Sequence, residues 1–273
     1  MFDANIDMID RVMRGMGPDK QSVDRALGAR VVMNIPAVHV PSFCSQKYKN
    51  AYDLGNLSDQ AAVPSGGKVP RRYAVDKALT TLTNTSATDI YFGALELNGT
   101  GVRFYGDLCL VLNDREIPGN TVVLESNSYD LVRPPLAKFS DASTPATLAA
   151  HARDMHGRWD ADMHVIATLK VIERHNPTLR RFTTGQISES VLNDEDYIEV
   201  LKIGSFDKDK LQEVRLSAAD AAAESQIGER LRLGPTPSLA ELQWRKHRRA
   251  AIKALRKHRV ASRIVTTSGR VRQ

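Results

Sequence analysis

The sequence predicts an α+β fold, in which helices and strands are mixed without the regular βαβ alternation of a parallel sheet. Apolar residues recur at helical spacing near both ends of the chain, and three strand-like segments follow one another in its first half. Turn signals at Asn98-Gly99 and Pro118-Gly119 separate those three segments. At 273 residues, with 42% of them hydrophobic, the chain is long and apolar enough to bury a core.

The N-terminal part is expected to begin with helices. Helical spacing of apolar residues predicts one helix over 2–13 and a second, short one over 19–28. The segment 30–43 is predicted to be a strand that two prolines interrupt, which places His39 near a strand end or bend.

The next elements alternate less regularly. A helix over 71–83 is expected before the three central strands, which are predicted at 89–99, 101–114 and 120–132. A linker at 133–145 follows. The remaining predicted elements are helices at 146–157 and 160–175, strands at 196–206 and 213–217, a helix at 218–232 and a final helix whose N-cap is Ser238.

The charge distribution separates the end of the chain from the rest. The formal net charge is +6, yet residues 243–273 hold 11 Lys and Arg and no Asp or Glu, while the remainder holds 27 basic and 32 acidic residues. We therefore predict a catalytic α+β domain over 1–235, with a helical insertion at about 145–180, and a basic helical extension and tail over 236–273.

The basic extension has two interpretations, which both stay open. It is either a footprint for an acidic partner or nucleic acid, or a surface helix packed on the acidic body. A narrow apolar stripe at Ala251, Ile252 and Leu255 leaves a wide cationic face. For RNA or DNA bound through phosphates, the predicted contacts are Arg245, Lys246, Arg248, Arg249, Lys253, Arg256 and Lys257.

Several classes of protein are not supported by the sequence. No apolar run reaches the length of about 18 residues that a membrane-spanning helix needs. The N-terminus lacks the order of a signal peptide. Cys44 and Cys109 alone do not suggest a disulfide framework, and both are predicted to be small buried side chains. These observations predict a cytoplasmic protein.

A carboxylate lies in the middle of the apolar strand predicted at 196–206. Tyr197, Glu199 and Leu201 share one face of that strand, so Glu199 should pack into the protein or line a cleft. Burial of a carboxylate is costly unless a partner compensates for its lost hydration. The alternative is an exposed sheet edge, where a nearby arginine neutralises the charge.

The order of the motifs resembles that of the bacterial toxin-type mono-ADP-ribosyltransferases. The matching segments are Tyr105-Gly106-Asp107 before an apolar strand, Glu125 to Leu131 after another strand, and Tyr197 to Leu216 around the carboxylate. This resemblance implies an ADP-ribosyltransferase-like split β-sandwich with flanking helices, which cradles NAD and faces it with the catalytic Glu199.

The resemblance also implies further contacts to NAD. His39, or alternatively Arg30, would hold the nicotinamide ribose, Tyr91 or Tyr105 would stack on nicotinamide, and Ser126 would lie in the element that follows the strand. Relatives that modify arginine carry a second glutamate at the position of Tyr197. Its absence favours RNA, DNA or a Ser/Thr acceptor, and a toxin of this kind implies an antitoxin partner.

A third hypothesis is a metal-dependent nuclease. His156, Asp160 and His164 are spaced i, i+4 and i+8, so one continuous helix would bring them to the same face. Gly157 interrupts that helix, and a solvated polar face explains the same pattern, so we expect no metal site. The non-enzymatic alternative is a nucleic-acid-binding protein that uses the basic C-terminal helix.

Overall fold

The computed structural model describes residues 28–50, 52–54, 71–132, 149–150, 152–153, 155–174, 191–193 and 196–266. The helices predicted before Gly28, the linker at 133–145 and the tail from residue 267 lie outside this part of the chain.

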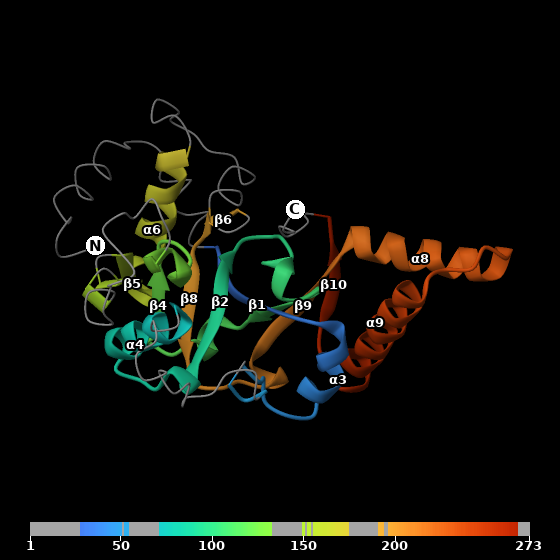
Figure 1. Ribbon diagram of the computed structural model, residues 1–273, viewed down its shortest axis with the longest axis horizontal. Coiled ribbons are helices and arrows are strands. Elements are labelled where there is room, and N and C mark those ends of the chain that lie inside the picture. The colour runs from blue at the N-terminus through green and yellow to red at the C-terminus, as the bar shows by residue number, and fades with distance from the viewer. Residues whose placement is uncertain are drawn as a thin grey trace, which may run out of the picture. The chain divides into compact units, whose positions relative to one another are not determined.

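The described residues form a mixed α/β fold with an eight-stranded sheet and five α-helices (Figure 1). The strands are hydrogen-bonded in the order β10-β9-β3-β1-β2-β8-β4-β5, and β6 and β7 form a separate pair. The chain divides into two compact units. The first unit comprises Met1–Ala29, Lys49–Gly93 and Ile117–Ser205, and the second comprises Arg30–Tyr48, Ala94–Glu116 and Phe206–Gln273. This division does not test the predicted boundary at residue 235.

Most elements of the second unit lie in its first segment, 30–48, or in its last segment, 206–273. Its helices and strands are β1 (Arg30–Ile35), η1 (Ala37–His39), α3 (Val40–Phe43), η3 (Arg103–Tyr105), β3 (Leu108–Leu112), η4 (Asp114–Glu116), η6 (Lys208–Lys210), β9 (Leu211–Ser217), α8 (Ala218–Leu233), α9 (Leu239–Lys257) and β10 (Ser262–Val265).

The sheet of the second unit is mainly antiparallel. Strand β1 pairs with β3 and with the end of β2 (Ile90–Glu96), and β3 pairs with β9. All five residues of β3 are buried, as expected for a central strand. β10 runs parallel to β9, and α8 and α9 form the crossover that a parallel pair requires. No strand was predicted at β10.

The first unit holds the remaining elements. They are α4 (Arg71–Thr83), η2 (Ala87–Asp89), the start of β2, β4 (Val122–Leu124), η5 (Ser128–Val132), β5 (His156–Arg158), α6 (Trp159–Arg174), β6 (Leu192–Asn193), β7 (Asp196–Tyr197) and β8 (Glu199–Ile203). β4 lies between β5 and β8 and is antiparallel to both. Helix α4 contributes Val75 and Leu79 to a core that includes Leu124 and Leu201.

Several predicted strands are shorter in the structure than in the sequence prediction. The strand predicted at 30–43 ends at Ile35, and His39 lies in η1. The strand predicted at 101–114 begins only at Leu108, after η3. The strand predicted at 120–132 is limited to β4 and is followed by η5. The prolines and polar residues at these ends favour turns over continued pairing.

Two further sequence predictions, one of a continuous strand and one of a helix, were wrong in their extent. The strand predicted at 196–206 is divided at Ile198 into β7, which pairs with β6, and β8, which pairs with β4. The Ile198 N–H donates to the Val191 carbonyl at 2.8 Å and extends the β6–β7 pairing by one residue. The helix predicted at 146–157 does not reach its expected end, because His156–Arg158 pair with β4. At His156–Arg158 a strand distant in sequence takes the backbone hydrogen bonds.

The predicted start of the basic helix is confirmed. Ser238 is the N-cap of α9 and accepts from the Glu241 N–H, while the Glu241 carboxylate accepts from the Ser238 N–H at 2.8 Å, which completes a capping box. The hydrogen bond from Arg230 is the main cause that lowers the pKa of Glu241 to about 2, and the two Ser238 donors add to it.

We predict that Ser238→Ala lowers the free energy of unfolding by about 1 kcal/mol, because an N-cap acceptor is lost. The Glu241 contribution is present above its unfolded pKa of 4.5 and is lost as the pH falls through that value towards 2. Urea unfolding at neutral and acidic pH measures both effects. Ser225→Ala, which removes a hydroxyl from an exposed position within α8, is the control; equal losses for the two variants would contradict the capping role.

Candidate functional site

Glu199 is the first residue of β8, and its side chain is 4% exposed. The Ser128 backbone N–H donates to its Oε2 at 2.9 Å, and the Tyr197 hydroxyl lies 3.5 Å from its Oε1. The carboxylate is therefore held inside the first unit and does not lie at an exposed sheet edge.

Asn127, in the loop after β4, and Ser128, the first residue of η5, complete this arrangement. We name it the Glu199 cluster (Asn127, Ser128, Tyr197 and Glu199). The Asn127 side-chain amide donates to the Tyr197 hydroxyl at 3.0 Å. The Ser128 Oγ is buried without a hydrogen-bond partner among the described residues. A main-chain amide and a phenol thus orient the carboxylate.

The other residues predicted in the first unit lie in different settings. Ser126 is half-buried and precedes the Glu199 cluster in the same loop. Tyr91 lies in β2, is 4% exposed, and donates through its hydroxyl to Asp53 at 3.2 Å. Burial, followed by the nearby Asp53 charge, raises the pKa of Tyr91 to about 12. Its ring is enclosed by protein.

The remaining predicted contacts belong to the second unit. His39 is exposed at the end of η1. Tyr105 is 50% exposed and packs edge-to-face against Phe104, with ring centroids 5.1 Å apart. Of the two predicted tyrosines, Tyr105 has the accessible ring. Arg30, the alternative to His39, forms an ion pair with Asp114 at 3.2 Å.

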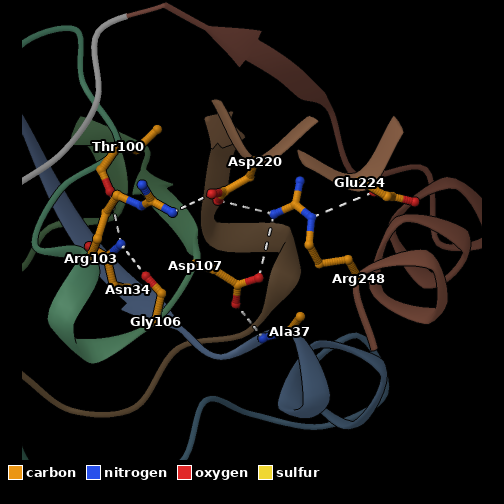
Figure 2. A network of polar contacts seen from close by, with 9 residues as sticks. All are labelled: Asn34, Ala37, Thr100, Arg103, Gly106, Asp107, Asp220, Glu224 and Arg248. Atoms are coloured by element: carbon orange, nitrogen blue, oxygen red, sulfur yellow. Dashed lines mark hydrogen bonds and ion pairs between the residues drawn. The ribbon is translucent and has the colours of Figure 1, made fainter. Parts of the chain in front are cut away.

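A second polar centre, which the sequence did not predict, surrounds Arg248 of α9 (Figure 2). Its guanidinium is 1% exposed. Nη1 lies 3.4 Å from the Asp107 carboxylate and 3.3 Å from the Asp220 carboxylate, and Nε lies 3.6 Å from that of Glu224. The three carboxylates compensate for the lost hydration of the arginine.

This network extends to the neighbouring turns (Figure 2). Arg103 of η3 also pairs with Asp220. Asp107 accepts from the Ala37 N–H of η1 at 2.8 Å, and the Asn34 side chain donates to the Gly106 carbonyl at 3.0 Å. We define the Arg248 network as Arg103, Asp107, Asp220, Glu224 and Arg248. It connects α8 and α9 with η3 through Arg103 and with η1 through Asp107.

The motif Tyr105-Gly106-Asp107 has a structural role that the resemblance did not anticipate. A Cβ at position 106 would lie 2.2 Å from the Ile35 carbonyl carbon, so only glycine permits this close approach. Asp107 then reaches both Ala37 and Arg248. The chain needs Gly106 and Asp107 for packing, whether or not they serve a ligand.

The prediction that Arg248 contacts nucleic acid is wrong, because its side chain is buried and paired with carboxylates. The burial of Arg248 could have been predicted from the sequence. Arg248 precedes Ala251 and Leu255 by three and seven residues, so it lies on the same buried stripe of α9. Arg245 is half-buried. The exposed cations of the predicted set are Lys246, Arg249, Lys253, Arg256 and Lys257.

The spacing behind the nuclease hypothesis does not form a single helical face. His156 lies in β5, whereas Asp160 and His164 lie in α6. Within the described residues, no group of three or more His, Cys, Asp and Glu side chains is arranged to hold a metal ion. The helices of this part of the chain also include none that is long and apolar enough to cross a membrane.

Comparison of the chain with protein-family models, curated proteins and solved structures found no match.

We predict that Arg248→Met lowers the free energy of unfolding by about 3–5 kcal/mol, because it leaves buried carboxylates without their cation. Arg249→Met, which removes the same charge from the exposed neighbouring position, should change it by no more than about 0.5 kcal/mol. Chemical unfolding followed by circular dichroism compares the two variants. Similar small effects would show that the Arg248 network does not stabilise the second unit.

Proposed function

We propose that this protein is a mono-ADP-ribosyltransferase that transfers ADP-ribose from NAD to a macromolecular acceptor, RNA or DNA. The single observation that carries the proposal is the Glu199 carboxylate, which is buried at the start of β8 and oriented by the Ser128 N–H. The motif resemblance assigns the catalytic role to this same residue.

The chemistry requires a fixed negative charge beside the sugar. Cleavage of the nicotinamide–ribose bond gives the ribose oxocarbenium character, as in glycoside hydrolysis. A preorganised carboxylate stabilises that positive charge without reorganising during the reaction. Glu199 fits this role because a backbone amide fixes one of its oxygens, and the buried Ser128 hydroxyl offers a second polar group beside it.

The other roles follow the resemblance. Within the first unit, Ser126 would contact NAD from the segment that precedes the Glu199 cluster. His39 and Tyr105 belong to the second unit, and their roles stay predictions of the resemblance alone. The family's split β-sandwich, the cytoplasmic location and an antitoxin partner belong to the same proposal. Exposed cations of α9 would guide a nucleic-acid acceptor.

We predict that Glu199→Gln lowers the rate of ADP-ribose transfer from NAD by about 10²–10³-fold, because it removes the stabilising charge while keeping the shape. Labelled NAD is incubated with the protein and with RNA, DNA or protein acceptors, and the products are separated. Glu116→Gln, which removes a surface carboxylate paired with Lys210, is the control.

Binding is measured separately from chemistry. If NAD binds the native state, it raises the melting temperature of the wild-type protein and of Glu199→Gln. Absence of this shift, together with equal transfer by wild type and Glu199→Gln, would falsify the proposed function.

A non-enzymatic nucleic-acid-binding protein is the second candidate, and the exposed cationic face of α9 favours it. Lys246, Arg249, Lys253 and Lys257 are exposed along this helix. Deletion of 243–273 cannot test this candidate, because it would also remove the buried Arg248, Ala251 and Leu255.

We predict that the double variant Lys253→Gln/Lys257→Gln weakens RNA binding and reduces the magnitude of the negative slope of log K against log salt by about 1.4, since two phosphate contacts to a single strand are lost. Fluorescence anisotropy over a salt series measures the slope. Arg263→Gln, which removes a cation already paired with Glu213, is the control. An unchanged slope in the double variant would exclude this face as the RNA contact.

A further inference from the structure

Helices α8 and α9 meet at their connection and separate towards β9 and β10 (Figure 1). The space between them is a groove of about 560 Å³ that both helices line, which we name the α8–α9 groove. It lies wholly within the second unit.

The lining residues of each helix follow a regular spacing. On α8 the groove extends from Ala221 through Ser225 and Gly228 to Arg232, and on α9 from Arg245 to Ile252. These positions recur every three or four residues, so each helix presents one face to the groove. The lined part of α8 is about 16 Å long, which matches about three turns of another helix.

The wall of the groove is cationic. The charges of Arg248 and Glu224 pair with each other, at 3.6 Å. Arg232, Arg245 and Arg249 also line the groove and have no ion-pair partner among the described residues, whereas Glu229 is the one further acid in the lining. The Arg245 Nε is buried without a hydrogen-bond partner in this part of the chain.

Gly228 of α8 makes room for this arginine. A Cβ at position 228 would lie 3.0 Å from the Arg245 Nη2, so the guanidinium lies directly over the glycine backbone. Glycine within a helix costs about 1 kcal/mol relative to alanine. The α8 sequence therefore gives up helix stability at the point where the groove wall needs space.

The floor of the groove is apolar. Leu216, Ala221, Ile252 and Ile264 line it, and Ile264 is 59% exposed. Three exposed leucines lie at the ends of the two helices, next to their connection, with Leu231 48%, Leu233 72% and Leu239 71% exposed. Phosphodiester backbones do not require exposed leucines, whereas a protein interface buries them.

We propose that the α8–α9 groove docks an acidic amphipathic helix of a partner protein. Its apolar face would cover Ile252 and Ile264, and its carboxylates would pair with Arg245 and Arg249. The length of the groove, its apolar floor and the uncompensated arginines together match the helix-in-groove mode of recognition. This inference does not depend on NAD chemistry.

The test uses the full chain and a defined probe. The probe is a fluorescein-labelled peptide of about 15 residues, with leucine at every third or fourth position and glutamate on both sides of that stripe. A peptide of the same composition with the stripe scrambled is the peptide control, and a single-stranded RNA oligonucleotide is the alternative ligand. Fluorescence anisotropy measures binding to wild type, Arg245→Glu/Arg249→Glu and Lys253→Glu/Lys257→Glu.

The proposal expects the amphipathic peptide to bind wild type at least about tenfold more tightly than its scrambled control. The reversal at Arg245 and Arg249 should weaken that binding by at least about tenfold, whereas the matched reversal at Lys253 and Lys257 should change it by less than about threefold. Circular dichroism tests whether both variants are folded. If the arginine variant does not fold, Ile252→Ser, which removes part of the groove floor, takes its place and should likewise weaken binding of the amphipathic peptide.

Three results would overturn the proposal. They are equal binding of the two peptides, equal loss in the two charge-reversal variants, and RNA binding that depends on Arg245 and Arg249 while the amphipathic peptide does not bind. Since NAD-induced stabilisation is measured separately, each of these results leaves the ADP-ribosyltransferase proposal to its own test.

Discussion

The fold of the second unit depends on the burial of one positive charge. An arginine that is 1% exposed would be strongly destabilising without compensating carboxylates, so Arg248 can occupy its place only if Asp107, Asp220 and Glu224 converge on it. Asp107 immediately precedes β3, and Asp220 and Glu224 lie in α8. The ion pairs therefore determine how α9 packs on η1 and α3, and how the crossover between β9 and β10 is arranged.

The two polar centres satisfy the same physical requirement with different partners. Arg248 is surrounded by opposite charges, which neutralise it and give it a structural role. Glu199 accepts from a backbone amide and lies near a phenol, and both groups orient the carboxylate. We propose chemistry for the Glu199 cluster, because a preorganised carboxylate stabilises a developing positive charge, and a stabilising role for the Arg248 network.

Sequence reasoning located the residue at the centre of the candidate site but not its partners. Glu199 was identifiable because a carboxylate in an apolar run is costly to bury. Its donor, Ser128, lies 71 residues away in sequence, so only the pairing of β4 with β8 brings the two together. The same limit applies to Arg248: its position on the buried stripe of α9 was visible, but Asp107 is 141 residues away and Asp220 is 28.

The sequence by itself determined the local structure: the capping box at Ser238 and Glu241, and helices close to α4, α6, α8 and α9, because capping and helical spacing depend on residues a few positions apart. Only the tertiary structure decided where strands end, that residues 262–265 form β10, and which charges of α9 are buried. Strand pairing and the compensation of buried charges depend on residues that are distant in sequence. No local pattern therefore specifies either.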